Sequence, residues 1–387
     1  MSTPMTSSQR VAAALRFERT DYVPLFDQYW GGFLAAWRTR HGLPPRHDIP
    51  LDDVVYNDED IQSYFGIDLY KAIPDEDPWP GQKRRLAEQD GYIIEQDGWG
   101  RVVRRRATSP YGEALQVRLT SRRALERLEF EPADSPQRYA RMLAEIEAAR
   151  RLERQPYIFF KIGGPYLRSS FLRGELQWYL DIAEDPEFAA ALAARVTDHL
   201  IAVGVEALRR ARLSDTSIWI FDDVASNQGP LVSPRAYERL FLPQVRRMVA
   251  AFKAAGASYV GYHSDGDLRP LLDGLVDAGI SILNPVEPRA HMDVVALRQR
   301  YGHRLAFVGG ICNSLILPFG SQEELRRHVE HVLSVADEGG LVIGSHSISN
   351  DVSQERYQLF VDILCQHGRP RPGSWGTTTR RAQPGGA

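Results

Sequence analysis

Short apolar segments alternate with helix-length amphipathic segments from residue 135 onward, and this alternation limits the fold more than any other feature of the chain. Within each apolar segment most of the apolar residues follow one another directly instead of alternating with polar residues, as expected for strands whose two faces are both covered. A strand followed by a helix, repeated in this way, indicates parallel strands joined by crossover helices. The predicted strands are residues 157–162, 217–221, 258–262, 281–283, 305–308 and 341–344, and the predicted helices are residues 135–154, 186–212, 233–255, 267–278, 292–301 and 321–338.

The number of these units favours a closed barrel. The six units, with one or two more from the N-terminal half that include a short strand over residues 22–26, give about eight. We therefore predict an α/β fold of the (β/α)8 TIM-barrel type rather than an open doubly wound sheet. The glycine-rich phosphate-binding fingerprint of open nucleotide-binding folds does not occur in the sequence. Gly163-Gly164-Pro165 cannot replace it, because proline has no backbone N–H to offer a phosphate.

Two segments depart from the barrel pattern. Two β-prone runs flank Asp97-Gly98, a dipeptide typical of hairpin turns, so we predict an inserted β-hairpin over about residues 91–118. Residues 370–387 are rich in Pro, Gly, Arg and Thr and are predicted to be disordered. The preceding residues, 1–369, are predicted to form a single barrel domain.

Composition bears on the partners and the compartment. The net charge of −3, without blocks of like charge, favours neither nucleic acid nor an anionic membrane as a partner. No apolar stretch is expected to reach the ~20 residues that span a bilayer. Only two cysteines occur, Cys312 and Cys365, which excludes a disulfide scaffold and fits a reducing compartment. Because the N-terminus has no signal-peptide pattern, we expect a cytoplasmic protein.

Polar side chains follow the predicted strands at the rim where a TIM barrel carries its active site. His263 and Asp265 follow one strand, and His346 follows another. Two imidazoles and one carboxylate suit a divalent metal, Zn2+ in the first place and Fe2+ as the alternative, with a position left open for substrate. The alternative for Asp265 is a structural role as the N-cap of the helix that starts near Leu268.

A second group of rim residues could handle protons or substrate. Asp222 and Asp223 form a carboxylate pair in which one group raises the pKa of the other and acts as acid or base. The alternative is that one of the pair caps a helix while the other faces the site. The predicted catalytic residues are Asp222, Asp223, Glu287 and His346, and the predicted substrate-binding residues are Gln28, Lys161, Tyr166, Arg168 and Asn284. Lys161 and Arg168 are expected to hold an anionic substrate, unless they lie on the surface.

Several motifs together resemble the uroporphyrinogen decarboxylase superfamily over about residues 8–367. They are Arg16-Phe-Glu-Arg-Thr-Asp-Tyr-Val-Pro, Gly163-Gly-Pro-Tyr, Asp222-Asp-Val-Ala-Ser-Asn-Gln-Gly-Pro-Leu-Val-Ser-Pro, His263-Ser-Asp-Gly, Asn284-Pro-Val-Glu, Gly309-Gly and Ser345-His-Ser. The resemblance implies a TIM barrel with its active site at the rim, and a lean toward a homodimer.

Two motifs distinguish between two branches of the superfamily. True uroporphyrinogen decarboxylases carry Met-Arg-Gln-Ala-Gly-Arg, whose arginines bind the tetrapyrrole carboxylates, whereas this chain has Phe26-Asp-Gln-Tyr-Trp-Gly-Gly at that place. The zinc-dependent, corrinoid-linked methyltransferases carry His-x-Cys-Gly and a distant Cys. Here His263-Ser-Asp-Gly and His346 stand at those positions, so carboxylate and imidazole replace two thiolates.

The resemblance therefore implies a metal-dependent methyltransferase or demethylase that moves a methyl group between a small substrate and a corrinoid carried by a partner protein. The alternative enzyme is a metal-independent decarboxylase (a lyase) that acts on a small carboxylate or a tetrapyrrole-like acid with Asp223 and His346 as acid and base. A third hypothesis is a binding protein that has kept the barrel without its chemistry. The dense polar rim argues against this last hypothesis.

Overall fold

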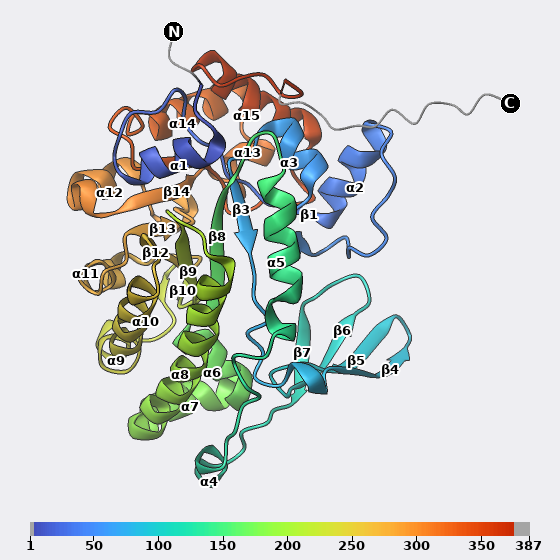
Figure 1. Ribbon diagram of the computed structural model, residues 1–387, viewed down its shortest axis with the longest axis vertical. Helices are drawn as coiled ribbons and strands as arrows, with labels where there is room; N and C mark the ends of the chain where they lie inside the picture. The colour runs from blue at the N-terminus through green and yellow to red at the C-terminus, as the bar shows by residue number, and fades with distance from the viewer. Residues whose placement is uncertain (1–3, 375–387) are drawn as a thin grey trace, which may run out of the picture.

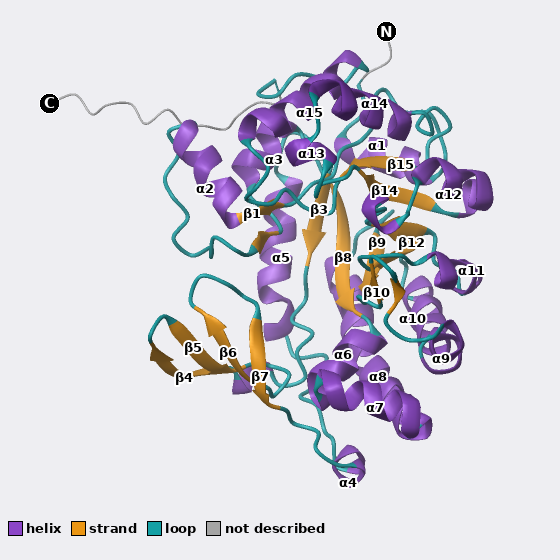
Figure 2. Ribbon diagram, turned by 180° about the vertical axis from the view of Figure 1, so that it is seen from behind, coloured by secondary structure: helices purple, strands orange, loops and turns teal. Residues whose placement is uncertain are grey.

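The computed structural model describes residues 4–374 and shows a curled parallel sheet surrounded by helices (Figures 1 and 2). Seven parallel strands pair in the order β15-β14-β13-β12-β9-β8-β3. They are β3 (Leu69–Ala72), β8 (Tyr157–Gly163), β9 (Ser217–Phe221), β12 (Tyr259–His263), β13 (Ile282–Asn284), β14 (Ala306–Gly310) and β15 (Leu341–Gly344). All six strands predicted after residue 135 are present, so the predicted α/β barrel class is confirmed.

A short segment around Leu25 joins the two edges of this sheet. Leu25 forms a parallel bridge with Ile343 of β15, and the Phe26 N–H donates to the Ile343 carbonyl at 2.9 Å. On the other side, the N–H of Asp68, which directly precedes β3, donates to the Leu25 carbonyl at 2.8 Å. This segment lies within the strand predicted over residues 22–26 and supplies the eighth position of the barrel.

Aromatic side chains fill the inside of the barrel. Trp219 stacks on Phe159 with ring centroids 4.0 Å apart, and Phe26 meets Phe159 edge-on at 5.5 Å. Gly261 leaves room for this layer, because a Cβ there would lie 2.6 Å from Cδ1 of Trp219. The interior is a packed core, so the space for chemistry lies at the carboxyl ends of the strands.

Helices cover the outer face of the sheet. The main ones are α1 (Ser7–Leu15), α5 (Gln137–Arg150), α6 (Pro165–Arg173), α7 (Glu175–Glu184), α8 (Pro186–Ala211), α9 (Pro234–Leu240), α10 (Leu242–Ala254), α11 (Arg269–Asp277), α12 (Val294–Tyr301), α14 (Gln322–Leu333) and α15 (Gln354–Gln366). The single helix predicted over residues 233–255 is wrong, because it is divided into α9 and α10. Pro243 lies in the first turn of α10 and has no N–H to continue the ladder of α9.

Shorter elements connect these layers. They are β1 (Tyr29–Trp30), α2 (Gly31–Arg40), β2 (Val54–Val55), α3 (Glu59–Phe65), η1 (Pro80–Gln82), α4 (Arg122–Glu126), β10 (Ala225–Ser226), β11 (Gly229–Pro230), η2 (Pro288–Ala290), η3 (Gly302–Arg304) and α13 (Ile316–Phe319). Strand β1 pairs with β2, and β10 pairs with β11, both antiparallel.

Helix α8 is 26 residues long and largely apolar. Among residues 4–374 it is the one helix long and apolar enough, by length and composition alone, to cross a membrane, which the sequence analysis did not expect. More than half of its apolar window is buried inside the protein. Its buried face packs against α5, α6, α7 and α10, which is the arrangement of a core helix.

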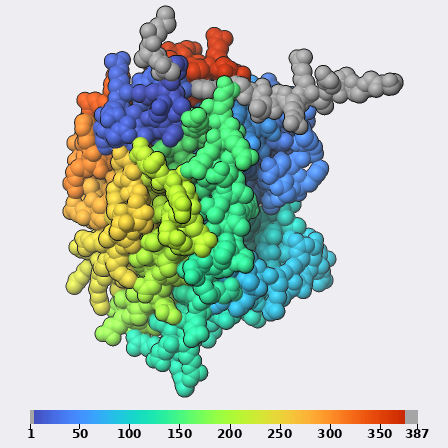
Figure 3. Space-filling view, viewed as in Figure 1, coloured from blue at the N-terminus to red at the C-terminus, as the bar shows by residue number. Residues whose placement is uncertain are grey.

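The predicted hairpin is part of a larger inserted sheet. Strands β4 (Arg84–Gln89), β5 (Tyr92–Gln96), β6 (Val102–Arg106) and β7 (Gly112–Gln116) pair in that order, all antiparallel. The β5–β6 turn contains the predicted Asp97-Gly98. Every residue of β4 and β7 is exposed, so neither strand has the buried positions that would mark it in the sequence. In Figure 3 this insertion, coloured cyan, forms a lobe on one side of the molecule.

The strand directions place the insertion at the end of the barrel where the carboxyl ends of the strands lie. Figure 2 shows the arrows of β3 and β8 pointing toward the end of the molecule that carries the inserted sheet, while the N-terminus lies at the other end. The tail prediction falls mostly on residues 375–387, which lie outside the described residues. Just before them, the Gly373 N–H donates to the Tyr64 carbonyl at 2.8 Å.

Candidate metal centre and active site

His263 is the last residue of β12 and is held on two sides. Its ring stacks on Phe221 of the neighbouring strand β9, with centroids 4.1 Å apart. Its Nδ1 lies 2.6 Å from Oδ1 of Asn284 at the end of β13. Because the Asn284 amide nitrogen donates to the Val308 carbonyl at 2.9 Å, the oxygen must face the imidazole and accept its Nδ1–H. The Nε2 lone pair of His263 is thereby left free to bind a metal.

Asp265 lies in the tight turn that follows β12. Gly266 makes this turn possible: its φ is +87°, and a Cβ there would lie 2.6 Å from the Ser226 carbonyl oxygen. The Asp265 side chain is 44% exposed, yet its Oδ1 atom is buried and has no hydrogen-bond partner among the described residues. Asp265 does not cap α11, whose N-cap position is Leu268. The structural alternative for Asp265 therefore fails.

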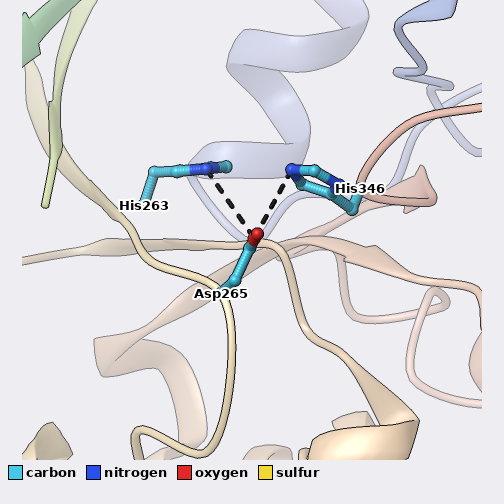
Figure 4. Close-up of side chains that lie close together, drawn as sticks. All are labelled: His263, Asp265 and His346. Atoms are coloured by element: carbon cyan, nitrogen blue, oxygen red, sulfur yellow. Dashed lines mark ion pairs between the residues drawn. The ribbon is translucent and has the colours of Figure 1, made fainter. Parts of the chain in front are cut away.

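His346 completes the cluster from β15, two residues beyond the end of the strand. Its Nε2 lies 3.4 Å from Oδ1 of Asp265, and Nε2 of His263 lies 3.9 Å from the same oxygen. The three candidate ligand atoms all lie within 4.8 Å of one another. Figure 4 shows the Asp265 oxygen between the two imidazoles, with both rings directed toward it. The Nδ1 atom of His346 lies 3.1 Å from the Ser347 hydroxyl.

These residues fit a divalent metal. Tetrahedral ligands at zinc distances of 2.0–2.1 Å are separated by about 3.4 Å, so the His346–Asp265 pair already has this spacing and His263 needs only a small shift. A buried carboxylate oxygen without a hydrogen-bond donor carries an energetic cost that a cation would remove. Two histidines and one carboxylate also leave coordination positions open for substrate.

The electrostatics of the cluster agree with this fit. Burial is the main cause that lowers the pKa values of His263 and His346, so both imidazoles are neutral near pH 7 and able to bind a metal. Burial, followed by the negative charge of Asp223, raises the pKa of Asp265 to about 7. Burial and the charge of Asp265 likewise raise the pKa of Glu287. The cluster has excess negative charge that a bound cation would neutralise.

The two neighbouring aspartates separate into different roles. Asp222 is fully buried, and its carboxylate accepts the N–H groups of Leu167 at 2.7 Å and Tyr166 at 3.2 Å in the first turn of α6. Burial raises its pKa to about 7. Asp223 is 47% exposed, lies 3.9 Å from Nε2 of His263 and accepts the Asp265 N–H at 3.4 Å. The structure therefore places Asp223 in the site and Asp222 at a helix N-terminus behind it.

Glu287 follows β13 and reaches the same turn. Its Oε2 accepts the Gly266 N–H at 2.8 Å, so it braces the backbone that carries Asp265. The charges of Asp265, His346 and Asp223 all influence its pKa, which places its carboxylate next to the cluster. The structure thus brings the predicted catalytic residues Asp223, Glu287 and His346 together.

The predicted substrate-binding residues divide into two groups. Gln28 accepts a hydrogen bond from Lys71 at 3.0 Å, and the Lys161 ammonium group lies 4.9 Å from the centroid of Phe221, the ring on which His263 stacks. Arg168 forms a buried ion pair with Glu76, so its charge is already neutralised within the protein. The Tyr166 hydroxyl donates to Tyr179 of α7 at 3.0 Å and its ring packs edge-on against Phe241, so the side chain points into the helical layer. Asn284, as described above, orients His263.

Lys71 is one residue of the site that the sequence did not reveal. It lies on β3, a strand of only four residues that the sequence pattern does not reveal, and its side chain is 1% exposed. Its ammonium group donates to Oε1 of Gln28 at 3.0 Å and lies 4.2 Å from the ring centroid of Tyr56. Burial and the charge of Lys161 lower the pKa of Lys71 well below its ordinary value. A lysine within a short apolar run was the feature of the sequence that could have indicated a buried, functional residue.

Tyr111, in the loop between β6 and β7, was also missed. It is 64% exposed, and its pKa is raised by burial, by Tyr56 and by the charges of Asp53, Asp265 and Asp223. These neighbours place the tip of the inserted sheet beside the mouth of the site. The same loop is joined to the barrel where the Asp52 N–H donates to the Thr108 carbonyl at 3.3 Å.

The segment that follows Leu25, which closes the barrel, holds the residue next to His346. Asp27 is fully buried, and its Oδ1 accepts both the N–H and the hydroxyl of Ser345, at 2.8 and 2.7 Å. The Tyr357 hydroxyl donates to Oδ2 at 3.0 Å. Burial raises the pKa of Asp27 to about 6 despite these three donors. The residue before His346 is thereby fixed to the first strand.

Residues 112–367, well over half of the chain, match the protein family described as Uroporphyrinogen decarboxylase (URO-D). The chain belongs to this family. A methyltransferase from Methanosarcina mazei has a similar structure, with a TM-score of 0.65 and 16% identity over 94% of this chain and 99% of that one. At this identity the likeness shows a shared fold. The resemblance inferred from the motifs of the family is confirmed.

Two further solved structures are more distant. A B12-independent methionine synthase from Shewanella sp. W3-18-1 has a TM-score of 0.34 and 12% identity over 79% of this chain and 83% of that one. A putative vitamin-B12 independent methionine synthase from Listeria monocytogenes has a TM-score of 0.39 and 12% identity over 90% and 97%. Scores this low carry no argument. No curated protein matches the chain.

Proposed function

We propose that this member of the uroporphyrinogen decarboxylase family is a metal-dependent methyltransferase, which moves a methyl group between a small substrate and a corrinoid carried by a partner protein. The observation that carries the proposal is the buried, unpartnered Oδ1 of Asp265 between the imidazoles of His263 and His346. These three residues would hold Zn2+ in the first place, with Fe2+ as the alternative.

A divalent cation in this position supplies Lewis acidity, which polarises a substrate heteroatom next to the methyl group. Asn284 fixes the tautomer and the direction of His263. Asp223, half exposed at the mouth of the cluster, is placed to exchange a proton with the substrate and solvent. Glu287 holds the Gly266 turn and contributes negative charge that favours a cation.

Two further observations support methyl transfer over porphyrinogen decarboxylation. The arginines that bind tetrapyrrole carboxylates in the true decarboxylases are absent from the Phe26–Gly32 stretch, where Gln28 instead bonds to Lys71. The barrel also shares its fold, over 94% of its length, with a protein named as a methyltransferase.

The first test is elemental analysis of the purified wild-type protein and of His263→Ala, with His367→Ala as the control because His367 is exposed and follows the last residue of α15. We expect about one equivalent of Zn2+ or Fe2+ in the wild type and in the control, and a large loss in His263→Ala. A wild-type protein without stoichiometric metal would contradict the proposal.

The second test addresses the reaction itself. Free cob(I)alamin replaces the corrinoid protein, small methoxy and methylthio acids serve as methyl donors, and formation of methylcobalamin is followed by absorbance. We expect methylation that a chelator abolishes and Zn2+ restores. Release of CO2 from a small acid in the presence of chelator, without methylation, would favour the metal-independent decarboxylase instead.

A further inference from the structure

Lysine is rare in this chain, and its placement is informative. Only four of the 47 basic side chains are lysines, and two of them, Lys71 and Lys161, lie together inside the barrel. Lys71 is on β3 and pairs in register with Phe159 on β8. Lys161 is two residues beyond Phe159, so it points to the same face one layer closer to the rim.

Both ammonium groups lie close to the same two aromatic rings, those of Tyr56 and Phe221. The Lys71 Nζ is 4.2 Å from the Tyr56 centroid and 4.6 Å from the Phe221 centroid. The Lys161 Nζ is 5.0 and 4.9 Å from the same two centroids and donates to the Tyr56 hydroxyl at 3.4 Å. The two positive charges therefore share one compartment with aromatic walls.

This compartment has no internal counter-ion. Within residues 4–374 no carboxylate forms an ion pair with Lys71 or Lys161, whereas nearby Arg168 is paired with Glu76. A buried ammonium group without an anion is energetically unfavourable. The backbone of Lys71 is nevertheless fixed, because Asn57 accepts its N–H at 3.2 Å and donates to its carbonyl at 2.8 Å.

The compartment adjoins the metal cluster through Phe221. The ring that the two lysines approach is also the ring on which His263 stacks, at 4.1 Å. Lys71 and His263 are thus neighbours of one aromatic ring, which places the two lysines beside the metal cluster.

We infer that Lys71 and Lys161 form the anion-binding half of the active site and that the substrate is a small carboxylic acid. Its carboxylate lies between the two ammonium groups, against the rings of Tyr56 and Phe221, while its reacting heteroatom faces His263, Asp265 and His346. Gln28, which accepts a hydrogen bond from Lys71, has an amide nitrogen without a partner in the described part of the chain and can donate to the same carboxylate. This inference names the substrate class and rests on the proposed function.

The test uses benzoate as the probe and isothermal titration calorimetry on the full-length protein. Lys71→Met and Lys161→Met remove each charge with little change in volume, and Lys253→Met is the control because Lys253 lies on α10 and donates to the Ser258 carbonyl. We expect each barrel variant to bind benzoate at least about tenfold more weakly, as the loss of a charged hydrogen bond predicts, and the control to bind as the wild type does. Benzamide, the neutral isostere, should bind as weakly as benzoate binds to Lys71→Met.

Two further readouts separate binding from a structural role. Because burial lowers the pKa of Lys71 and a bound carboxylate favours its charged form, benzoate affinity should fall as the pH rises through that lowered pKa, and this pH dependence should disappear in Lys71→Met. The ligand-free Lys71→Met protein should melt at or above the wild-type temperature, since burial of the lysine amine carries a desolvation cost that burial of Met does not. A lower melting temperature would instead indicate that Lys71 supports the fold.

The outcomes also distinguish this inference from the proposed function. Unchanged benzoate affinity in Lys71→Met, or no binding by the wild type, overturns the inference, and tighter binding of inorganic phosphate than of benzoate overturns the carboxylate assignment. All titrations are repeated after chelation and after Zn2+ loading. Lysine-dependent benzoate binding by a protein that holds no metal would reject the metal-dependent function alone, whereas a stoichiometric metal without benzoate binding would reject this inference alone.

Discussion

The side-chain oxygen of Asn284 lies 2.6 Å from Nδ1 of His263, and this contact fixes which nitrogen of the imidazole can bind a metal. Replacing Asn284 with Leu removes the acceptor and lets the ring rotate and change tautomer. We expect metal affinity to fall by about 10–100-fold, in the range seen for groups that orient ligands. Competition with a chromophoric zinc chelator measures this change. Asn284→Asp, which keeps the acceptor, should lose less affinity, and equal losses in both variants would contradict the orienting role.

Asp265 should destabilise the metal-free protein when it is ionised. Its pKa is raised to about 7 in the folded chain, so as the pH rises Asp265 loses its proton in the unfolded chain before it does so in the folded chain. The free energy of unfolding therefore falls as the pH rises from about 4 to 7. Asp265→Asn removes this charge. After treatment with chelator at pH 8, we expect the variant to melt at a higher temperature than the wild type. Addition of Zn2+ should reverse the order, because only the wild type gains a full ligand set. Equal melting temperatures with and without Zn2+ would argue against both statements.

The barrel itself follows from the sequence, whereas parts of the site do not. Continuous apolar runs that end in polar residues are sufficient to predict β9, β12 and β15 and the ligands that follow them, because burial on both faces leaves a clear signal. Strand β3 has only four residues, and the segment at Leu25 pairs with β15 through a single bridge. In both places the run of apolar residues is too short to distinguish a strand from a loop. Lys71 was missed for that reason.

Pairing between side chains is also invisible in the sequence. Asp222 and Asp223 are chemically identical neighbours, and only the position of α6 decides that one accepts helix N–H groups while the other faces His263. Arg168 likewise looks like an anion-binding residue until Glu76, far away in the chain, neutralises it. Long-range partners of this kind depend on tertiary packing.

His199 should make stability depend on pH below neutrality. It is buried on α8, its Nε2 contacts the Glu76 carbonyl at 2.9 Å, and burial lowers its pKa to about 4. Between pH 6.5 and 4 the unfolded chain binds a proton that the folded chain does not, so stability is lost as the pH falls through this window. The loss amounts to about 3 kcal/mol. Urea unfolding of His199→Gln across this range should show a smaller loss than the wild type, whereas the exposed control His367→Gln should behave as the wild type does.

Gly164 should tolerate no side chain. A Cβ at this position would overlap the side chain of Asp222, which is fixed by its bonds to the first turn of α6. Overpacking of this kind costs roughly 1–3 kcal/mol, so we expect Gly164→Ala to lower the free energy of unfolding by about that amount. Gly81→Ala is the control, because a Cβ there meets only the flexible end of the Glu131 side chain, at 3.3 Å. Similar unfolding curves for the two variants would show that Asp222 can move.

The hydrogen bond between Asp27 and Ser345 has a consequence for how the protein folds during its synthesis. It joins residues 318 positions apart, beside the last ligand of the cluster, and the barrel cannot close between the Leu25 segment and β15 until β15 exists. A nascent chain still on the ribosome thus carries His263 and Asp265 without the support that orders His346. A cluster whose third member arrives last can capture its ion only after synthesis of nearly the whole polypeptide, so metal loading should coincide with completion of folding.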